Sequence, residues 1–188
     1  MLEHILELDR RLFYFINHDL ANPVFDVLMP VFRNKFTWIP LYVLIAWQLI
    51  RQFKRAGVLA IVLLALCFGA ADQISAGIIK KQVQRVRPCN QPAMEAYVTE
   101  RVDCGTGLSF PSSHATNHFA VAVFISIVFY QLWKPVLWIS LAWASLICFA
   151  QVYVGVHFPV DVLTGAVLGS LIGAFFAWIF KRTAPLLS

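Results

Sequence analysis

Five long apolar segments dominate the sequence, and short polar clusters separate them. No Asp, Glu, Lys or Arg occurs within residues 36–50, 56–71, 111–133, 135–160 and 162–180. About 20 apolar residues are needed for a helix to cross the hydrocarbon core of a bilayer, and flanking residues can extend the shorter segments. The pattern therefore predicts an all-α, polytopic transmembrane helical bundle with five spans.

The first 35 residues show a different pattern. Apolar residues recur at helical spacing among charged ones in residues 2–15, which is typical of an amphipathic helix in the membrane interface. Residues 22–32 are apolar but short and contain Pro23, Asp26 and Pro30, so they form either a second interfacial piece or part of a tilted sixth span. Acidic residues near the N-terminus exclude a cleavable signal peptide, whose first region is basic.

The composition agrees with a membrane protein. Of the 188 residues, 60% are hydrophobic and 13% are charged, and the mean hydropathy of +0.71 leaves too little polar surface to cover a water-soluble globule. The net charge of +5 does not indicate a nucleic-acid partner, because no basic stripe with interleaved aromatic residues lies outside the apolar segments.

The distribution of basic residues predicts the orientation. Lys and Arg without acidic neighbours occur at every second junction between the apolar segments, namely Arg51, Lys54, Arg55, Lys134, Lys181 and Arg182. Short basic loops of this kind stay in the cytoplasm. The other junctions should face outward, and they contain three polar clusters, at 80–88, 111–114 and 157–161. We expect the clusters to converge at the extracytoplasmic surface, because ionisable groups at a membrane boundary are costly unless they form a site.

The first cluster, residues 80–88, concentrates positive charge where an apolar segment ends. Pro88 ends the helix and biases Arg87 toward an extended conformation. Two or three fixed cations are what a phosphate dianion requires, and Lys80, Arg85 and Arg87 can supply them. The alternative is a band of basic side chains that extend toward lipid headgroups, which would explain this cluster alone.

The second cluster, Pro111-Ser112-Ser113-His114, immediately precedes the next helix. One serine can cap this helix, and the free backbone N–H groups at its start would form an anion site. Helix capping alone is the alternative. His114 favours a site, because an imidazole beside bound phosphate can donate a proton to a leaving oxygen. His118, one turn later, is expected to pack inside the bundle.

The third cluster contains His157 and Asp161, which share a helix face if Pro159 lies in the first turn. A carboxylate bonded to one ring nitrogen fixes the tautomer and leaves the other nitrogen free to attack phosphorus. The alternative is an ordinary N-terminal helix acid beside an interfacial histidine. Each cluster has such an alternative, but three clusters in this order favour a phosphate-handling active site.

The four cysteines leave one structural question open. Cys67 and Cys148 lie inside apolar segments and are expected to be inert. Cys89 and Cys104 share the long outward connection from about 81 to 111, where a disulfide and two unlinked thiols are equally compatible with the sequence. No metal-ligand spacing such as CxxC or HExxH occurs, so no metal is expected.

The three clusters resemble the motifs of the type-2 phosphatidic acid phosphatase (PAP2) superfamily. That pattern is Lys, six residues, Arg-Pro; then Pro-Ser-Gly-His; then Ser-Arg, five residues, His, three residues, Asp. The chain shows Lys80 with Arg87, then residues 111–114, then His157 with Asp161. By this resemblance the chain is one integral-membrane phosphatase domain, 1–188, with an interfacial region at 1–35 and a catalytic core at 56–180.

The resemblance also implies roles for individual residues. His157 would be the nucleophile that forms a phosphohistidine, Asp161 would orient it, and His114 would protonate the departing oxygen and then activate water. The phosphoryl oxygens would be held by Lys80, Arg87 and Ser112. No metal or other cofactor would be needed, because these donors can neutralise the developing charge.

Two departures from the family pattern affect the phosphate clamp. Ser113 stands where Gly is usual, which is tolerable if the backbone there has negative φ. Gln151, preceded by Ala150, stands where the pattern has Arg; it can donate hydrogen bonds to phosphate but carries no charge. Losing a cation could cost a few kcal/mol of transition-state stabilisation, which is about a hundredfold in rate. The candidates to compensate are Arg85, Lys81 and Arg101.

The expected function is a lipid phosphatase of the inner membrane with its site on the periplasmic face. The partners would be bilayer lipids and a lipid phosphate or pyrophosphate: undecaprenyl pyrophosphate, lipid A, phosphatidylglycerophosphate or phosphatidic acid. The alternative is a catalytically impaired phospholipid-binding or transport protein, which Gln151 suggests. A vanadate haloperoxidase of the same superfamily is excluded by the hydropathy, and the oligomeric state is left open.

Overall fold

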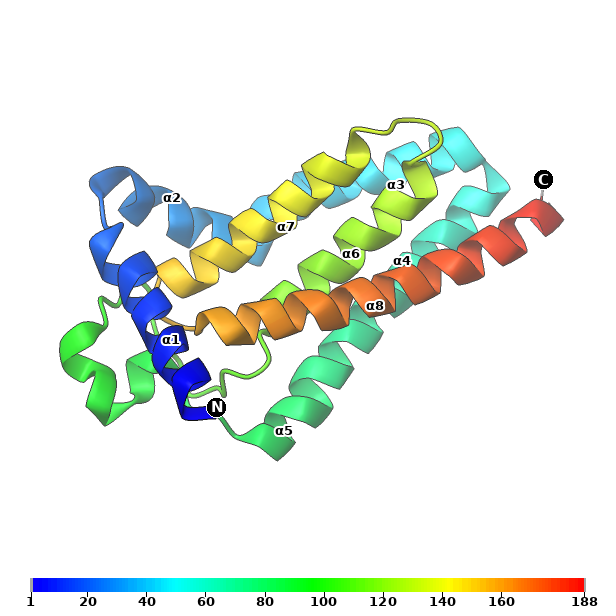
Figure 1. The fold of residues 1–188 in the computed structure, drawn as a ribbon. Coiled ribbons are helices and arrows are strands. Elements are labelled where there is room, and N and C mark those ends of the chain that lie inside the picture. The colour runs from blue at the N-terminus through cyan, green and yellow to red at the C-terminus, as the bar shows by residue number, and fades with distance from the viewer. Residues whose placement is uncertain (1, 188) are drawn as a thin grey trace.

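The computed structural model describes residues 2–187; Met1 and Ser188, the ends of the expected domain, lie outside the described residues. Within that range the regular elements are helices, and no strand occurs. Five long helices run alongside one another (Figure 1): α3 (Ile39–Phe53), α4 (Arg55–Asp72), α6 (Ser113–Phe129), α7 (Val136–Tyr153) and α8 (Pro159–Thr183). The expected all-α bundle is confirmed.

Three helical stretches are long and apolar enough to cross a membrane. They are α7, α8 and the 29-residue stretch Arg55–Val83, in which α4 continues through a π-helical segment into α5 (Lys80–Val83). The helix α6 is apolar but has 17 residues, and α3 has 15. Three of the five expected spans are therefore long and apolar enough to cross a membrane. That α3 and α6 also cross it stays a prediction.

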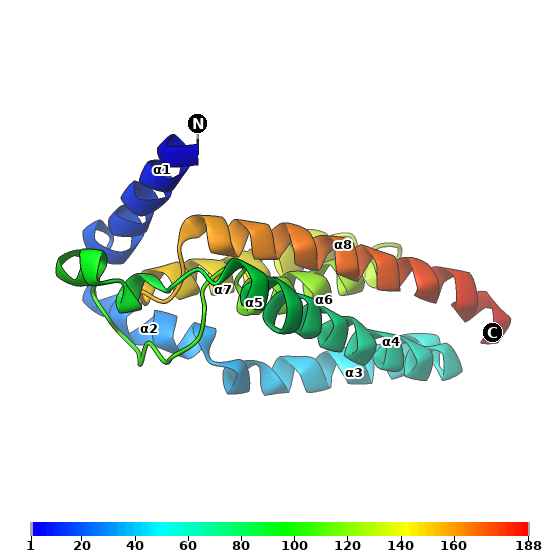
Figure 2. The same cartoon turned by 90° about the horizontal axis from the view of Figure 1, so that it is seen from below.

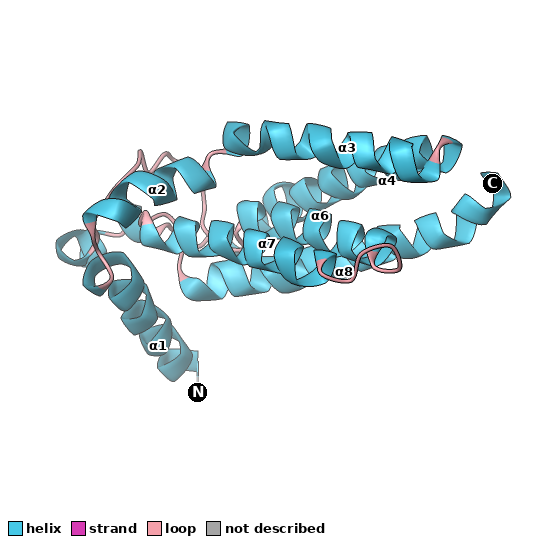
Figure 3. Cartoon of the chain, turned by 90° about the horizontal axis from the view of Figure 1, so that it is seen from above, coloured by secondary structure: helices cyan, strands magenta, loops and turns pink. Residues whose placement is uncertain are grey.

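The loops lie at the two ends of the bundle (Figure 3). The turns after α3 and α6 and the end of α8 occupy one end, whereas α1, α2 and the long connection after α5 lie at the other end (Figure 1). The basic turns named above thus lie at the opposite end of the bundle from the three polar clusters. This arrangement is the one that the alternation of apolar and basic segments requires.

The helices α6 and α8 pack with their backbones in close approach. A Cβ added at Gly165 would lie 2.6 Å from the carbonyl oxygen of Ser112, and one added at Gly169 or Gly173 would overlap a carbonyl oxygen of α6. Small residues at four-residue spacing allow such approach between membrane helices. This packing fixes the starts of α6 and α8, and hence two of the three polar clusters, at the same end.

The N-terminal helices cover that end of the bundle. The helix α1 (Leu2–Tyr14) projects away from the other helices (Figure 2) and exposes apolar side chains such as Leu8, as an interfacial helix would. The helix α2 (Pro23–Arg33) packs against α7 through Phe25, whose ring lies 5.7 Å from that of Tyr153. With 11 residues, α2 is about half the length that a span requires, which favours the interfacial alternative for this segment.

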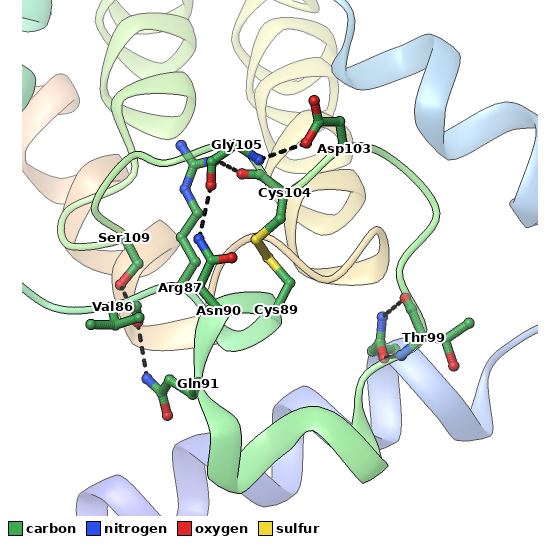
Figure 4. Close-up of a disulfide and its surroundings, with 11 residues drawn as sticks. Val86, Arg87, Cys89, Asn90, Gln91, Thr99, Asp103, Cys104, Gly105 and Ser109 are labelled. Carbon is green, nitrogen blue, oxygen red and sulfur yellow. Dashed lines mark hydrogen bonds between the residues drawn. A yellow bond between two sulfur atoms is a disulfide. The ribbon is translucent and has the colours of Figure 1, made fainter.

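A disulfide crosses the long connection between α5 and α6. Cys89 and Cys104 are bonded, with their Cα atoms 6.0 Å apart, which decides between the two alternatives that the sequence left open (Figure 4). The side chain of Arg87 donates a hydrogen bond to the Cys104 carbonyl, and Asn90 donates to the Gly105 carbonyl at 2.8 Å. The crosslink therefore holds the two halves of the loop together around Arg87.

Candidate active site

The structure brings the three polar clusters into direct contact. The backbone N–H of Ser112 donates to the carbonyl of Asp161 at 3.0 Å, which joins the second cluster to the third. The first cluster is joined to the segment before α6 by two hydrogen bonds. One runs from the Ser109 N–H to the Arg85 carbonyl at 2.7 Å, and the other from Lys80 Nζ to the Leu108 carbonyl at 2.9 Å.

His157 and Asp161 form the centre of this site. His157 lies in the turn between α7 and α8, and Asp161 lies in the first turn of α8, which Pro159 begins. Both side chains are buried, and Nδ1 of His157 lies 3.6 Å from Oδ2 of Asp161. This separation is longer than a full hydrogen bond, and it would become an ion pair when the imidazole gains positive charge. The same Oδ2 accepts from the Phe158 N–H at 2.9 Å, which fixes the carboxylate relative to the turn.

The environment of His157 favours the neutral imidazole. Burial lowers the pKa of His157 from its ordinary value of 6.5 to about 4, and the Asp161 carboxylate opposes this effect only in part. The positive charges of Lys80 and Arg87 act in the same direction as burial. The ring therefore has an unprotonated nitrogen at neutral pH, which is the form that can attack phosphorus.

Asp9 on α1 was not anticipated, although its neighbourhood gave a signal. It lies four residues after Ile5 and four before Phe13, so it is an acid on the apolar face of the helix. Asp9 is 1% exposed; its Oδ2 accepts from Arg85 at 2.6 Å, and its Oδ1 accepts from the Val160 N–H at 2.8 Å. The N-terminal helix is therefore tied to the first turn of α8 beside the candidate nucleophile.

Arg85 lies between two carboxylates. One terminal nitrogen donates to Asp9, and the other donates to Oδ1 of Asp161 at 2.6 Å. Its guanidinium carbon lies 4.1 Å from the centre of the Phe158 ring. Both terminal nitrogens of Arg85 serve carboxylates, so Arg85 is positioned to orient Asp161. Its binding of phosphate, expected from the sequence, stays a prediction.

The start of α6 contributes a helix cap and a free hydroxyl. Oγ of the buried Ser112 accepts from the Ala115 N–H at 3.4 Å, so Ser112 caps the helix. Oγ of Ser113 is buried and has no hydrogen-bond partner among the described residues. The His114 ring stacks against that of His118, with centroids 6.1 Å apart.

His118 has a structural environment. Its Nδ1 lies 2.7 Å from the His114 carbonyl, and its Nε2 lies 3.2 Å from the hydroxyl of Tyr42 on α3. The side chain is 5% exposed. The expectation that His118 packs inside the bundle is confirmed.

Three basic side chains at the site have no carboxylate within salt-bridge distance in the part of the chain that the structure describes. They are Lys80, Arg87 and Arg33. Lys80 and Arg87 make hydrogen bonds to backbone carbonyls only. Arg33, the last residue of α2, was missed because a lone Arg in the last turn of a short helix is an ordinary feature of sequences.

The proposed compensators for Gln151 do not reach the site as free cations. Arg101 is paired with Asp26 and donates to the carbonyls of Asn17 and Tyr153. Lys81 is exposed, and Arg85 has the two partners described above. None of these three residues is a buried cation without a carboxylate partner among the described residues.

Unpaired buried polar atoms concentrate at the site. Eight such side-chain atoms occur among the described residues, and six of them belong to Arg33, Arg87, Ser113, Gln151 and His157. Buried polar groups in folded proteins nearly always have partners, so a cluster of unpaired ones favours a polar ligand. Five of these six atoms are nitrogens or a hydroxyl able to donate, which matches the acceptor oxygens of a phosphoryl group.

Comparisons with known proteins agree with this geometry. A family model described as the PAP2 superfamily matches residues 56–184. A lipid A 4'-phosphatase of Bacteroides thetaiotaomicron is 31% identical over all of this chain and 84% of its own length. A lipid A 4'-phosphatase of Porphyromonas gingivalis is 30% identical over 93% of this chain and 73% of its own length. The crystal structure of a transmembrane PAP2-type phosphatidylglycerolphosphate phosphatase from Bacillus subtilis has a similar fold, with a TM-score of 0.74 at 24% identity, covering 95% of this chain and 87% of that chain.

Proposed function

Because this chain belongs to the PAP2 superfamily and is a membrane lipid phosphatase, we propose that it hydrolyses a phosphate monoester of lipid A through a phosphohistidine at His157. The observation that carries the proposal is a buried, neutral imidazole beside Asp161, close to cations that have no carboxylate partner among the described residues. Lipid A is the preferred substrate class because the two relatives described above are lipid A 4'-phosphatases.

The positions of the side chains support a mechanism in two steps. Nε2 of His157 attacks phosphorus while the bond between phosphorus and the lipid oxygen breaks, and His114 gives its proton to that oxygen. The imidazole gains positive charge in this step, and the Asp161 carboxylate, 3.6 Å from Nδ1, stabilises it. In the second step His114 takes a proton from water, the water oxygen attacks phosphorus, and the bond to Nε2 breaks to release orthophosphate.

The phosphoryl oxygens would be held by fixed donors. Lys80 and Arg87 supply charge, the Ser113 hydroxyl is free to donate, and the first backbone N–H groups of α6 point out of the helix. In a partly buried site such donors act at low dielectric and need no reorganisation during the reaction. Ser112 caps the helix by accepting a hydrogen bond, and its hydroxyl proton can still be donated to a phosphoryl oxygen.

The proposal places the site at the periplasmic surface of the inner membrane. The basic turns at the opposite end of the bundle support this orientation, since such turns are retained in the cytoplasm. A lipid substrate can keep its acyl chains in the bilayer and reach the site laterally. The exposed apolar side chains of α1 would keep that helix at the same interface.

A second candidate is a phospholipid-binding or transport protein that retains the site without turnover. The uncharged Gln151 favours it, because this buried side chain brings no cation to the motif position, and neither of its amide atoms has a partner among the described residues. This candidate predicts binding of lipid phosphates without release of orthophosphate.

The two candidates are separated by measuring phosphate release from the purified protein in detergent. The substrates are lipid A, undecaprenyl pyrophosphate, phosphatidylglycerophosphate and phosphatidic acid. We expect the highest kcat/KM for lipid A, no effect of a chelator, and a loss of about 10³-fold or more in His157→Gln. His18→Gln, which changes an exposed histidine of the interfacial region, serves as the matched control and should be unaffected.

Each result has a definite meaning. Lipid binding without phosphate release in the wild type would support the second candidate. Turnover that survives in His157→Gln would exclude this residue as the nucleophile. Preference for undecaprenyl pyrophosphate by tenfold or more would retain the mechanism and refute the substrate assignment.

A further inference from the structure

Arg33 is a cation without a counter-ion at the edge of the site. The side chain is partly buried, its Nε is buried without a hydrogen-bond partner, and no carboxylate lies within salt-bridge distance among the described residues. Arginine is rarely buried unless it is paired, because desolvation of the guanidinium must be compensated. The contacts of Arg33 with the described residues therefore do not compensate for the desolvation of its guanidinium.

The surroundings of Arg33 are themselves positive. Its charge acts on the ring of His114, and burial together with the neighbouring charge of Arg87 lowers the pKa of Arg33. Two guanidinium groups placed near each other repel, and the repulsion is larger at a partly buried position. A bound phosphate dianion would convert this repulsion into attraction for both groups.

The position of α2 brings Arg33 to the part of α7 that contains Gln151. Phe32 packs against the hydrophobic cluster that contains Ala150 and Tyr153 of α7, so the C-terminal end of α2, where Arg33 lies, is next to the C-terminal part of α7, which contains Gln151. Gln151 is 0% exposed, and neither its Nε2 nor its Oε1 has a partner among the described residues. Gln151 is uncharged, and it occupies the motif position at which the sequence resemblance leads one to expect a cation.

We propose that Arg33 binds the phosphoryl group of the substrate and supplies, from α2, the positive charge that Gln151 lacks. The inference rests on the proposed phosphatase function. The planar fork of a guanidinium can hold two phosphoryl oxygens at once, and the Gln151 amide can donate to one of them while its carbonyl accepts from Arg33. The phosphate clamp would then include a residue outside the 56–184 region that the family model matches.

The test combines a charge deletion with a rescue. Arg33→Gln should lower kcat/KM for lipid A by about 10²-fold, the effect of removing one preorganised donor, and should raise the inhibition constant of orthophosphate at least tenfold. Arg33→Lys should retain an intermediate activity, because a point charge replaces the fork. The double variant Arg33→Gln/Gln151→Arg should recover at least tenfold of the lost kcat/KM. Arg51→Gln, an exposed change at the other end of the bundle, is the matched control and should match the wild type.

The outcomes separate this inference from the proposed function. Wild-type kcat/KM and wild-type orthophosphate inhibition in Arg33→Gln would overturn the role of Arg33 while leaving the phosphatase assignment intact. Failure of the double variant to exceed Arg33→Gln, with both proteins folded by their thermal unfolding, would also overturn it. If the wild type releases no phosphate from any lipid, the proposed function fails. Orthophosphate binding, measured by calorimetry, then decides: loss in Arg33→Gln supports the site, and unchanged binding overturns it.

Discussion

The contacts of Asp9 on α1 with Arg85 and with the first turn of α8 predict that the interfacial helix controls the rate of the reaction. Asp9→Asn keeps the shape of the side chain and an oxygen able to accept from the Val160 N–H, but it removes the charge that faces Arg85. The guanidinium then has Asp161 as its one charged partner among the described residues. We expect the side chain of Arg85 to become more mobile, and the Asp161 carboxylate to be less well oriented toward His157.

The size of the effect follows from burial. Asp9 has 0% of its side chain exposed and Arg85 has 18%, so water screens the pair only weakly. Removing one partner of a buried ion pair costs about 3–5 kcal/mol, but Arg85 keeps a second carboxylate here, so the loss of stability should be roughly 1–3 kcal/mol. Displacement of a catalytic group by about 1 Å costs about 10²-fold in rate, so kcat should fall by roughly tenfold to a hundredfold. KM should change little, because Asp9 does not face the phosphate.

The assay is steady-state phosphate release together with rapid-quench measurement of the phosphoenzyme. Asp9→Asn should slow formation of the phosphoenzyme, whereas Glu7→Gln should not. Glu7 is the matched control, since it lies on the same helix and makes an exposed pair with Arg11 that contributes about 0.5 kcal/mol or less. If the two variants have the same kcat, or if the loss in Asp9→Asn appears only in KM, the reasoning about orientation is refuted.

Three further predictions concern other parts of the molecule. Replacing Cys89 and Cys104 by Ser should lower the free energy of unfolding by about 3 kcal/mol, and reductant should lower the Tm of the wild type but not of this variant; equal Tm values would contradict it. Gly169→Ala should lower Tm, because its Cβ would overlap a carbonyl oxygen of α6, whereas Gly69→Ala, with open space around it, should raise the stability by about 0.5–1 kcal/mol; matching shifts would refute the packing argument. The folded protein should lose stability as pH falls from 6.5 to about 4, because His157 is protonated in the unfolded chain in this window but not in the folded protein. The Tm values of the wild type and of His157→Gln should therefore converge toward pH 4, and a Tm difference that does not change with pH would contradict the lowered pKa.

The local parts of the site could be predicted from the sequence because spacing determines them. His157 and Asp161 are four positions apart on either side of Pro159, which starts α8, so the turn and the first helical turn bring the two side chains together. Ser112 precedes an apolar run as caps do. The meeting of the clusters followed from chain topology, since successive spans return alternate junctions to the same end. The helical bundle could be predicted because the apolar segments approach the length that a membrane-spanning helix requires.

The partners of the basic residues could not be predicted, because they depend on long-range contacts. Arg85 and Asp9 are 76 positions apart, and no periodicity in the sequence links them. The sequence placed Arg85, Arg87 and Lys80 in one cluster of like charge and gave no means to separate their roles. The disulfide was undecided for a related reason, since it depends on the path of a loop that has no regular pattern.

The distinction between structural and substrate-binding cations rests on their counter-ions. Arg85 and Arg101 each face carboxylates of the N-terminal region, so their charges are already balanced in the folded protein. Arg33, Lys80 and Arg87 have no carboxylate within salt-bridge distance among the described residues, so a bound dianion would balance charge that the folded protein leaves unpaired. The N-terminal helices thus contribute charges of both signs. Asp9 of α1 and Asp26 of α2 neutralise Arg85 and Arg101, respectively. Arg33 of α2 has no carboxylate partner among the described residues. A substrate with a dianionic phosphate is the ligand that satisfies this arrangement, because it brings two negative charges and several acceptor oxygens to a site made of donors.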